Sequence, residues 1–237
     1  MKYFTLVWIL IFGVGAMDAS MAKPLPVAKA ERVGMSSERL DRITAMTQKY
    51  VDEGKLAGVI TMVARDGKLV HFEAVGNKGA DDPRPLEKDD LFRIYSMTKP
   101  ITATAAMQLY EQGKFHMNDP VHKFIPEFKD LKVLNENGDQ VPVKNHMTMQ
   151  QLLSHTTGLS YGFDPINDPV DKLYVEAKLW EHENLDALMQ TVSKLPLKFE
   201  PGSAWHYSIA VDVTGAVIER ISGQSFDEYL EENIFDP

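Results

Sequence analysis

The feature that most constrains the fold of this chain is one strong β-hairpin signal placed ahead of a long helix-rich remainder. The segment "AGVITMVARDGKLVHFEAVG" (57–76) holds two runs of β-forming residues on either side of Asp66-Gly67. That dipeptide is typical of two-residue hairpin turns. Because a lone hairpin is only marginally stable in water, it needs further strands or a covering helix.

A covering helix is predicted directly before the hairpin, over residues 36–53. Leu40, Ile43, Met46 and Tyr50 recur there at spacings of three or four, and Ser36 or Ser37 can cap its start. After the hairpin, residues 81–90 ("DDPRPLEKDD") predict a polar loop broken by prolines.

Helical patterns dominate from residue 96 onward. Gly113 marks the end of the first helix, Thr148-Met-Gln-Gln151 is a capping box, and a second box starts at Ser225. The predicted helices are 96–113, a short one after Thr148, 184–193, 209–221 and 226–234. The segments between them predict an irregular stretch over 114–147 with a small hairpin near Asn137-Gly138, and a loop over 160–172.

Charge and composition exclude several classes of function. The 237 residues carry a formal net charge of −9, so no basic surface is expected for nucleic acid. The chain has no cysteine, which excludes a thiol nucleophile, a disulfide framework and cysteine-ligated zinc. His116 and His122 lie six residues apart, which is not one helical face, so neither a metal nor another cofactor is expected.

The first 22 residues predict a signal peptide. Lys2 precedes a short apolar run, and small residues at Ser20 and Ala22 fit cleavage after Ala22. We therefore expect a signal peptide over 1–22, a loose leader over 23–34 and one domain over 35–237. The mature chain would be exported, periplasmic or secreted, with no stable membrane anchor; an uncleaved anchor is the alternative.

Ser96 and Lys99, in "FRIYSMTKPIT" (92–102), are the first candidate pair for chemistry. On a helix, residues three apart share a face, so the lysine amine can meet the serine hydroxyl and accept its proton. The helix N-terminus adds backbone N–H groups that favour a developing oxyanion. The pattern S-x-x-K is common, since Ser20 and Lys23 also fit it, and a capping serine beside a solvated lysine is the plain alternative.

Tyr207, in "WHYS", is the third candidate. It follows a Pro-Gly turn and directly precedes a predicted helix, so its phenol can be poised near Lys99. As a phenolate, or by sharing a proton with the lysine, it can act as general base and then as general acid. Core packing is the alternative role for this tyrosine.

Three segments together resemble the serine β-lactamase-related superfamily, nearest to class C β-lactamase-like proteins and family VIII carboxylesterases. They are "FRIYSMTKPIT", "QLLSHTTGLSYGF" and the stretch from "FEPGSAWHYS" to Pro237. The resemblance implies a nucleophile at Ser96, a lysine partner at Lys99 and a catalytic tyrosine at Tyr207. It also implies an α+β, β-lactamase/transpeptidase-like fold, in which an antiparallel sheet made from both chain ends lies beside an all-helical region.

The same resemblance gives His155 a structural place under the site, in preference to the role of a triad base. Trp205 and Tyr161 either line an acyl pocket or pack in the core. Class C enzymes carry Tyr-x-Asn as a second motif, whereas this chain has Tyr207-Ser208-Ile209, which is closer to the esterases. Ser-Asp-Asn and a deacylating glutamate motif, which would indicate a class A β-lactamase, are not found in the sequence.

The family's third motif, on a late strand, does not follow Tyr207. We therefore expect an N-terminal portion of the family domain, incomplete at its C-terminus, with the C-terminal sheet strands absent. The expected function is a serine hydrolase that forms an acyl-enzyme on Ser96, foremost a carboxylesterase acting on small esters. The alternatives are a β-lactamase or peptidoglycan DD-peptidase acting on β-lactam or peptide substrates, and an inactive member that binds cell-wall peptide or a partner. The oligomeric state is left open.

Overall fold

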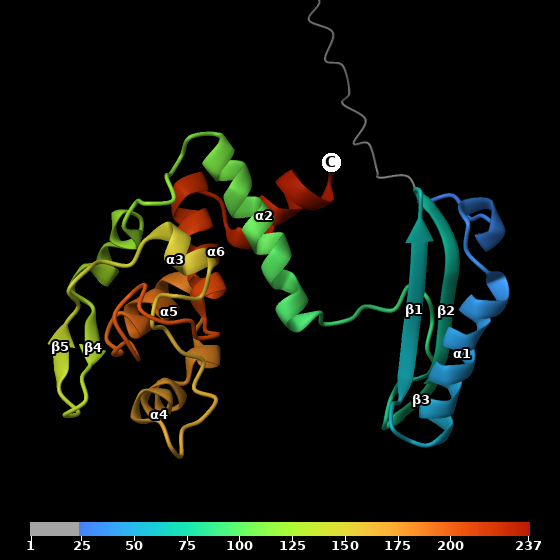
Figure 1. The fold of residues 1–237 in the computed structure, drawn as a ribbon, viewed down its shortest axis with the longest axis horizontal. Coiled ribbons are helices and arrows are strands. Elements are labelled where there is room, and N and C mark those ends of the chain that lie inside the picture. The colour runs from blue at the N-terminus through green and yellow to red at the C-terminus, as the bar shows by residue number, and fades with distance from the viewer. Residues whose placement is uncertain (1–23) are drawn as a thin grey trace, which may run out of the picture. The chain divides into compact units, whose positions relative to one another are not determined.

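The computed structural model describes residues 24–237, and the expected signal peptide lies outside them. The described chain divides into two compact units at the Tyr95–Ser96 boundary. We call residues 24–95 the sheet unit and residues 96–237 the helical unit, and describe each by itself (Figure 1). Among the described residues, no helix is both long and apolar enough to span a membrane.

The sheet unit is an antiparallel three-stranded sheet with one helix packed on it. Its strands β1, β2 and β3 lie in sequence order, and helix α1 contacts β1 and β2. The bounds are a 3-10 turn at Ala30–Val33, α1 at Ser37–Asp52, β1 at Gly58–Arg65, β2 at Lys68–Gly79 and β3 at Asp82–Pro85. Figure 1 shows α1 running alongside the sheet.

The predicted hairpin turn is confirmed. Asp66 and Gly67 have φ values of 50° and 66°, which is the left-handed pair that a two-residue turn between twisted strands requires. The pairing joins Arg65 to Lys68 and continues along both strands, with one irregularity at Val63. The hairpin is therefore built as the sequence indicates.

Two expectations for the sheet unit are wrong in part. Residues 82–85 lie inside the predicted loop 81–90, yet they form β3 against the end of β2. The predicted helix is present, with Ser36 as its N-cap, but Met46 and Tyr50 of its expected apolar face are exposed. Thr47 is buried instead, because its hydroxyl donates to the carbonyls of Ile43 and Thr44 and so needs no water.

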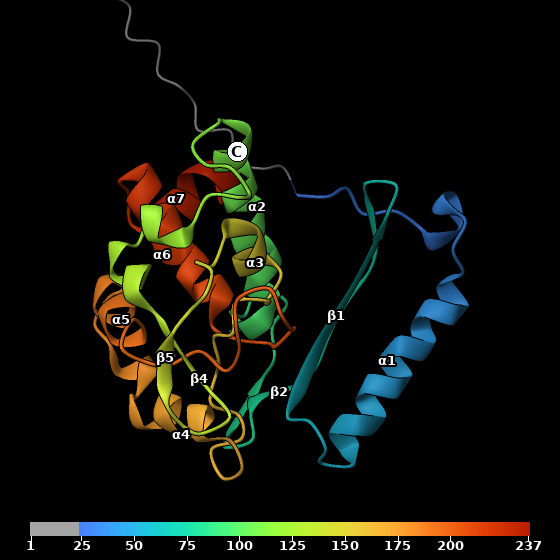
Figure 2. The same ribbon diagram turned by 60° about the vertical axis from the view of Figure 1, so that its left-hand side comes forward.

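The helical unit is a cluster of short helices around α6 (Figure 2). Its α-helices are α2 at Thr98–Glu111, α3 at Met149–Leu153, α4 at Pro169–Glu176, α5 at Leu185–Val192, α6 at Ala210–Ser222 and α7 at Phe226–Leu230. A π-helical turn follows at Glu231–Phe235, a small hairpin pairs β4 (Lys132–Leu134) with β5 (Gln140–Pro142), and 3-10 turns occur at Tyr95–Met97, Val121–Lys123, Pro126–Asp130 and Leu179–Glu181.

Helix α6 is the centre of this core. Eight of its thirteen residues are buried, and it packs against α2, α3, α5 and α7. Ala105 and Ala106 lie on the buried side of α2, and small side chains allow two helices to approach closely. This packing fixes the start of α2 relative to the start of α6, and the candidate residues come from those two helix starts.

Most boundaries predicted for the helical unit are confirmed, including both capping boxes and the Asn137-Gly138 hairpin. The predicted loop over 160–172 is too long, because α4 begins at Pro169 within it. Asp168 caps this helix by accepting from the N–H groups of Val170 and Asp171. A proline is favourable at the first helical position, since the N–H it lacks would have no partner there.

Candidate active site

Ser96 lies in the 3-10 turn that leads into α2, and its side chain is exposed. This position leaves its backbone N–H among the first groups of a helix, which have no partner within the helix itself. Tyr95, the residue before it, has a φ of 45°, in the left-handed region that non-glycine residues rarely adopt. Such local strain is held in place by surrounding structure, and it often occurs beside functional groups.

Lys99 follows one turn later and points back toward Ser96. Its Nζ lies 3.4 Å from Ser96 Oγ and 2.9 Å from the Tyr161 hydroxyl, to which it donates. The same nitrogen lies over the Tyr207 ring, 4.7 Å from the ring centroid. The lysine is therefore half-buried among hydroxyl groups and aromatic faces, and is not the solvated side chain of the plain alternative.

Tyr207 completes the contact around the serine. Its hydroxyl lies 2.6 Å from Ser96 Oγ, although the two residues are 111 positions apart in the sequence. The backbone N–H of His206 donates to the carbonyl of His155, which fixes the segment just before Tyr207. The three candidates chosen from the sequence, Ser96, Lys99 and Tyr207, thus meet within hydrogen-bond distance.

The charges in this cluster shift two pKa values in opposite directions. The Lys99 ammonium, and then the Ser96 hydroxyl, hold the pKa of Tyr207 below its ordinary value. Burial acts to lower the pKa of Lys99, but the phenols of Tyr161 and Tyr207 outweigh it and raise that pKa above its usual value. The arrangement favours a cationic lysine next to a phenol that is easier to ionise.

Two residues that the sequence analysis did not choose as catalytic candidates, Tyr161 and Asp212, extend the cluster. The Tyr161 hydroxyl donates to Asp212 Oδ2 at 2.9 Å, and its oxygen accepts from Lys99. Burial raises the pKa of Asp212, and burial also raises the pKa of Tyr161, to about 12. A signal for Asp212 was present, since it is the single acidic residue between Glu200 and Glu219, in an apolar helix.

The ring of His155 packs against the ring of Tyr207. Its ring centroid lies 4.8 Å from that of Tyr207, and its Nδ1 accepts from the backbone N–H of Ser208 at 3.2 Å. A nitrogen that accepts carries no proton, so the ring is neutral with its proton on Nε2. Burial lowers the pKa of His155, which agrees with a neutral ring. This geometry supports a structural role for His155, which holds the Tyr207 ring and the backbone at Ser208.

Aromatic side chains line the surface beside the cluster. Tyr161 stacks against Trp180 at 5.8 Å between ring centroids and makes a tilted contact with Phe163 at 5.1 Å, and Trp205 lies near Tyr207. Phe163, Trp180 and Trp205 are 69%, 66% and 66% exposed, although exposure of such large rings to water is unfavourable. The surface next to Ser96 is therefore suited to an apolar group.

The loop that carries Tyr161 and Phe163 is held by a buried carboxylate. Asp171 accepts from the Ser160 hydroxyl, from the backbone N–H of Asp164 and from Lys198 Nζ at 2.8 Å. Asp171 is 1% exposed, so these contacts replace the water that its carboxylate loses on folding. Lys198 also pairs with Asp168 at 2.7 Å, which ties the loop to the start of α4.

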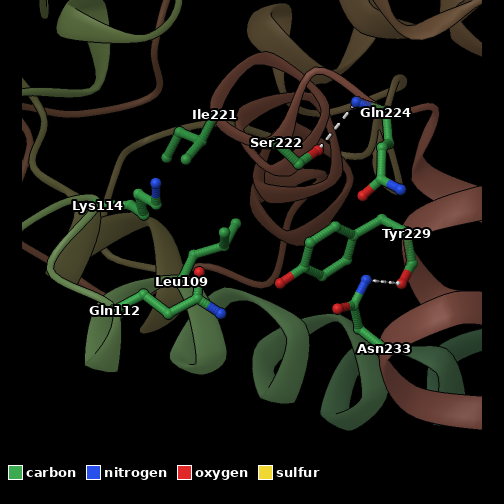
Figure 3. A pocket seen from close by; sticks show the side chains of 8 residues that line it. All are labelled: Leu109, Gln112, Lys114, Ile221, Ser222, Gln224, Tyr229 and Asn233. Carbon is green, nitrogen blue, oxygen red and sulfur yellow. Dashed lines mark hydrogen bonds between the residues drawn. The ribbon is translucent and has the colours of Figure 1, made fainter. Parts of the chain in front are cut away.

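No group of three or more histidine or acidic side chains that could hold a metal occurs within residues 24–237. Figure 3 shows a pocket in the helical unit whose lining includes Leu109 and Gln112. These residues lie at the C-terminal end of α2, roughly 20 Å along the helix from Ser96. Two polar groups of the pocket serve the local backbone: Ser222 Oγ accepts from the N–H of Gln224, and the amide of Asn233 donates to the carbonyl of Tyr229.

Ser96 thus lies at the start of a helix in a mainly helical unit, with the side chains of Lys99 and Tyr207 within hydrogen-bond distance of its hydroxyl. The chain belongs to the Beta-lactamase family, whose model matches residues 43–237. The fold is that of β-lactamase-like proteins. The solved structure of EstCE1, a hydrolase with promiscuous acyltransferase activity, superposes with a TM-score of 0.69 at 28% identity, over 83% of this chain and 51% of that one.

Two curated relatives carry named activities. Esterase EstB of Burkholderia gladioli is 34% identical over 185 residues, which cover 77% of this chain and 45% of EstB. A putative D-alanyl-D-alanine carboxypeptidase of Salmonella typhimurium is 28% identical over 244 residues, which cover 99% of this chain and 54% of the relative. The chain thus spans about half the length of the curated relatives it matches.

Proposed function

We propose that this chain carries the nucleophile-bearing part of a serine hydrolase that acts on small esters through an acyl-enzyme on Ser96. The observation that carries the proposal is the position of Ser96 Oγ, 2.6 Å from the Tyr207 hydroxyl and 3.4 Å from Lys99 Nζ. A serine hydroxyl becomes a good nucleophile only when a neighbouring group takes its proton, and both neighbours are within reach.

The reaction has two halves. Ser96 Oγ attacks the ester carbonyl while its proton passes to the Tyr207 phenolate, and the Ser96 N–H at the helix start stabilises the oxyanion. The C–O bond to the alcohol then breaks, and Tyr207 returns the proton to the departing alkoxide. Water attacks the acyl-enzyme in the same way, with its proton passing to Tyr207 and then to Ser96 as the carboxylic acid leaves.

Apolar esters are the favoured substrates for two reasons. The surface beside Ser96 presents the exposed rings of Phe163, Trp180 and Trp205, which can cover an apolar acyl or alcohol group. The residue two positions after Tyr207 is Ile209, whose apolar, buried side chain offers the site no side-chain amide. Both features support an ester over a polar peptide or a β-lactam.

A β-lactamase or peptidoglycan DD-peptidase is the second candidate. The similarity to the Salmonella carboxypeptidase favours it, because the name of that relative indicates a D-alanyl peptide substrate. It predicts hydrolysis of nitrocefin, or covalent labelling of Ser96 by a penicillin at low concentration. An inactive binding member predicts tight binding of ligand that survives Ser96→Ala.

The test is turnover of p-nitrophenyl butyrate by the whole protein, with nitrocefin in parallel. Ser96→Ala is expected to lower kcat by at least roughly 10⁴-fold, as in other enzymes that lose a nucleophile, while the thermal unfolding curve stays the same. Intact mass spectrometry with a slow ester should show one added acyl group in the native protein and none in Ser96→Ala. Unchanged turnover in the variant would refute the role of Ser96.

We also propose that the protein is exported. The basic, apolar and small-residue order of residues 1–22 supports cleavage after Ala22. N-terminal sequencing of the protein from its producing cell is expected to begin at Lys23. An N-terminus that still carries residues 1–22 on a membrane-bound product would favour the uncleaved anchor.

A further inference from the structure

A chain of three contacts leads from Ser96 into the helical core. Ser96 Oγ is bonded to Lys99, Lys99 donates to the Tyr161 oxygen at 2.9 Å, and the Tyr161 hydroxyl donates to Asp212 at 2.9 Å. An ionised carboxylate can only accept, so the proton of Tyr161 must point toward Asp212. The lone pairs of the Tyr161 oxygen are therefore left to face Lys99.

We infer that Asp212, acting through Tyr161, holds Lys99 in its ammonium form beside the Ser96–Tyr207 pair. The inference rests on the proposed function, since it assigns the charge state of Lys99 in that reaction. Asp212 is a positioning residue in this scheme, because it reaches the reacting serine only through other side chains.

One carboxylate and two aromatic rings favour the ammonium form of Lys99. The titratable groups that face it are Tyr161 from the loop, Asp212 from α6, Tyr207 and His155. Asp212 is the one carboxylate of this set, and an anion two hydrogen bonds away stabilises a cation at low local dielectric. Lys99 Nζ also lies over the Tyr161 and Tyr207 rings, at 5.2 and 4.7 Å from their centroids, which adds cation–π attraction.

A protonated lysine cannot accept the serine proton, which leaves Tyr207. The Tyr207 hydroxyl makes the shortest contact with Ser96 Oγ. The directions of the two pKa shifts agree with this division, because the pKa of Tyr207 is lowered, foremost by the Lys99 ammonium, and that of Lys99 is raised by the phenols against its burial. The lysine then stabilises the phenolate and does not compete with it.

A purely structural role for Asp212 is the competing explanation. The residue lies in the first turn of α6, where an acidic side chain interacts favourably with the helix dipole. Asp186 also lies in the first turn of its helix, α5, and bonds to Arg220 on the surface, away from the cluster. Asp186→Asn is therefore a matched control for the loss of a first-turn carboxylate.

The experiment compares pH–rate profiles of Asp212→Asn and Asp186→Asn in the whole protein, with p-nitrophenyl butyrate. Removing an anion makes every nearby group easier to deprotonate. Both limbs of the kcat/KM profile are thus expected to move to lower pH in Asp212→Asn, by about one unit. Asp186→Asn should leave the profile in place. Asp212→Glu, which restores the charge, should return the limbs toward those of the native protein.

A second measurement follows the ionisation of Lys99 directly and does not depend on turnover. In protein labelled with ¹³C at lysine Cε, the Lys99 resonance, assigned by its loss in Lys99→Arg, is expected to titrate above the ordinary lysine range. Asp212→Asn and Tyr161→Phe should both lower that midpoint. A Lys99 that titrates near neutral pH in the native protein, or limbs that stay in place in Asp212→Asn, would overturn the inference. Turnover that survives Ser96→Ala would instead overturn the proposed function, whatever the lysine titration shows.

Discussion

The sheet unit and the helical unit bury their side chains to very different extents. The helical unit holds one continuous cluster of buried apolar residues from α2 to α7, with α6 at its centre. The sheet unit buries few large side chains, chiefly Val33, Leu40 and Val75, and leaves Met62 and Leu56 of its strand region exposed. Its order comes mainly from the β1–β2 ladder and the helix packed on it.

This difference in burial bears on which unit can hold a catalytic site. A group of polar side chains keeps a fixed geometry only when packed neighbours hold the backbone and restrict the rotamers. The contacts among Ser96, Lys99, Tyr161, Tyr207 and Asp212 all arise within the helical unit. Substitutions in the two units are therefore expected to differ in their effect on stability.

Asp171→Ala is expected to cause the largest loss. It removes a buried carboxylate and leaves the partly buried Lys198 and the Ser160 hydroxyl with one partner fewer. The free energy of unfolding should fall by about 3 kcal/mol, the lower end for breaking a buried pair. Urea denaturation measures it. Asp186→Ala, which breaks an exposed pair with Arg220, should cost at most about 1 kcal/mol, and an equal loss in both variants would contradict the prediction.

Met189→Ala tests the apolar core of the helical unit. Met189 is fully buried on α5, so its truncation leaves a cavity that the surrounding helices fill only in part. A loss of about 2 kcal/mol in the free energy of unfolding is expected, at the lower end for truncation of a buried methionine. Hydrogen exchange should rise throughout α2, α5 and α6. A change confined to α5 would show that this core is not cooperative.

Asp171 also predicts how the helical unit responds to acid. Burial opposes ionisation of this carboxyl, but the bonds from Lys198 and Ser160 outweigh it and lower its pKa below the ordinary value. A group with a lowered folded-state pKa stabilises the protein fully above its unfolded pKa of about 3.9, and that contribution is lost as pH falls further. The native protein should lose stability below about pH 4 more steeply than Asp171→Asn, as followed by thermal unfolding.

Gly67→Ala acts on the hairpin turn of the sheet unit. At a φ of 66° an alanine Cβ is strained even though no atom lies within 4 Å of that position, so the cost is conformational and not a clash. About 1 kcal/mol of destabilisation is expected, near the cost of the left-handed region for a non-glycine residue. Hydrogen exchange should increase in β1 and β2, while Ser96 labelling is unchanged. Faster hydrogen exchange in α6, and not in β1 and β2, would contradict the difference between the two units.

Met62→Ala is the smallest change and the counterpart of Met189→Ala. Met62 is 56% exposed on β1, so its truncation removes little buried surface. The free energy of unfolding should change by no more than about 0.5 kcal/mol. A loss as large as that of Met189→Ala would mean that the two methionines are equally buried in solution, and the contrast would fail.

Much of the local structure could be predicted because its signals are short-range. The Asp66-Gly67 turn, the box at Thr148 and the helix start after Ser96 each depend on residues within a few positions of one another. Strand β3 was missed because its polar, proline-containing sequence carries no strand pattern, and only its pairing with β2 defines it. The start of α4 was marked by Asp168-Pro169, a cap and first-turn proline that the loop prediction passed over.

The site was predictable only where a motif named its residues. Ser96, Lys99 and Tyr207 were chosen from local patterns and a family resemblance. The contacts of Tyr161 with Lys99 and with Asp212 join positions 62 and 51 residues apart, and no periodicity in the sequence connects them. Such contacts follow from helix packing, which the sequence pattern does not specify.

The long sequence separations within the site also bear on how the chain folds. Contacts that close large loops carry an entropic cost that is recovered only when both ends are already packed. The Ser96–Tyr207 bond closes a loop of 111 residues, so we expect it to form late, after α2 and α6 have packed together. In a refolding experiment, recovery of this hydroxyl pair would therefore time the completion of the helical unit, whereas recovery of the hairpin turn would time only its own formation.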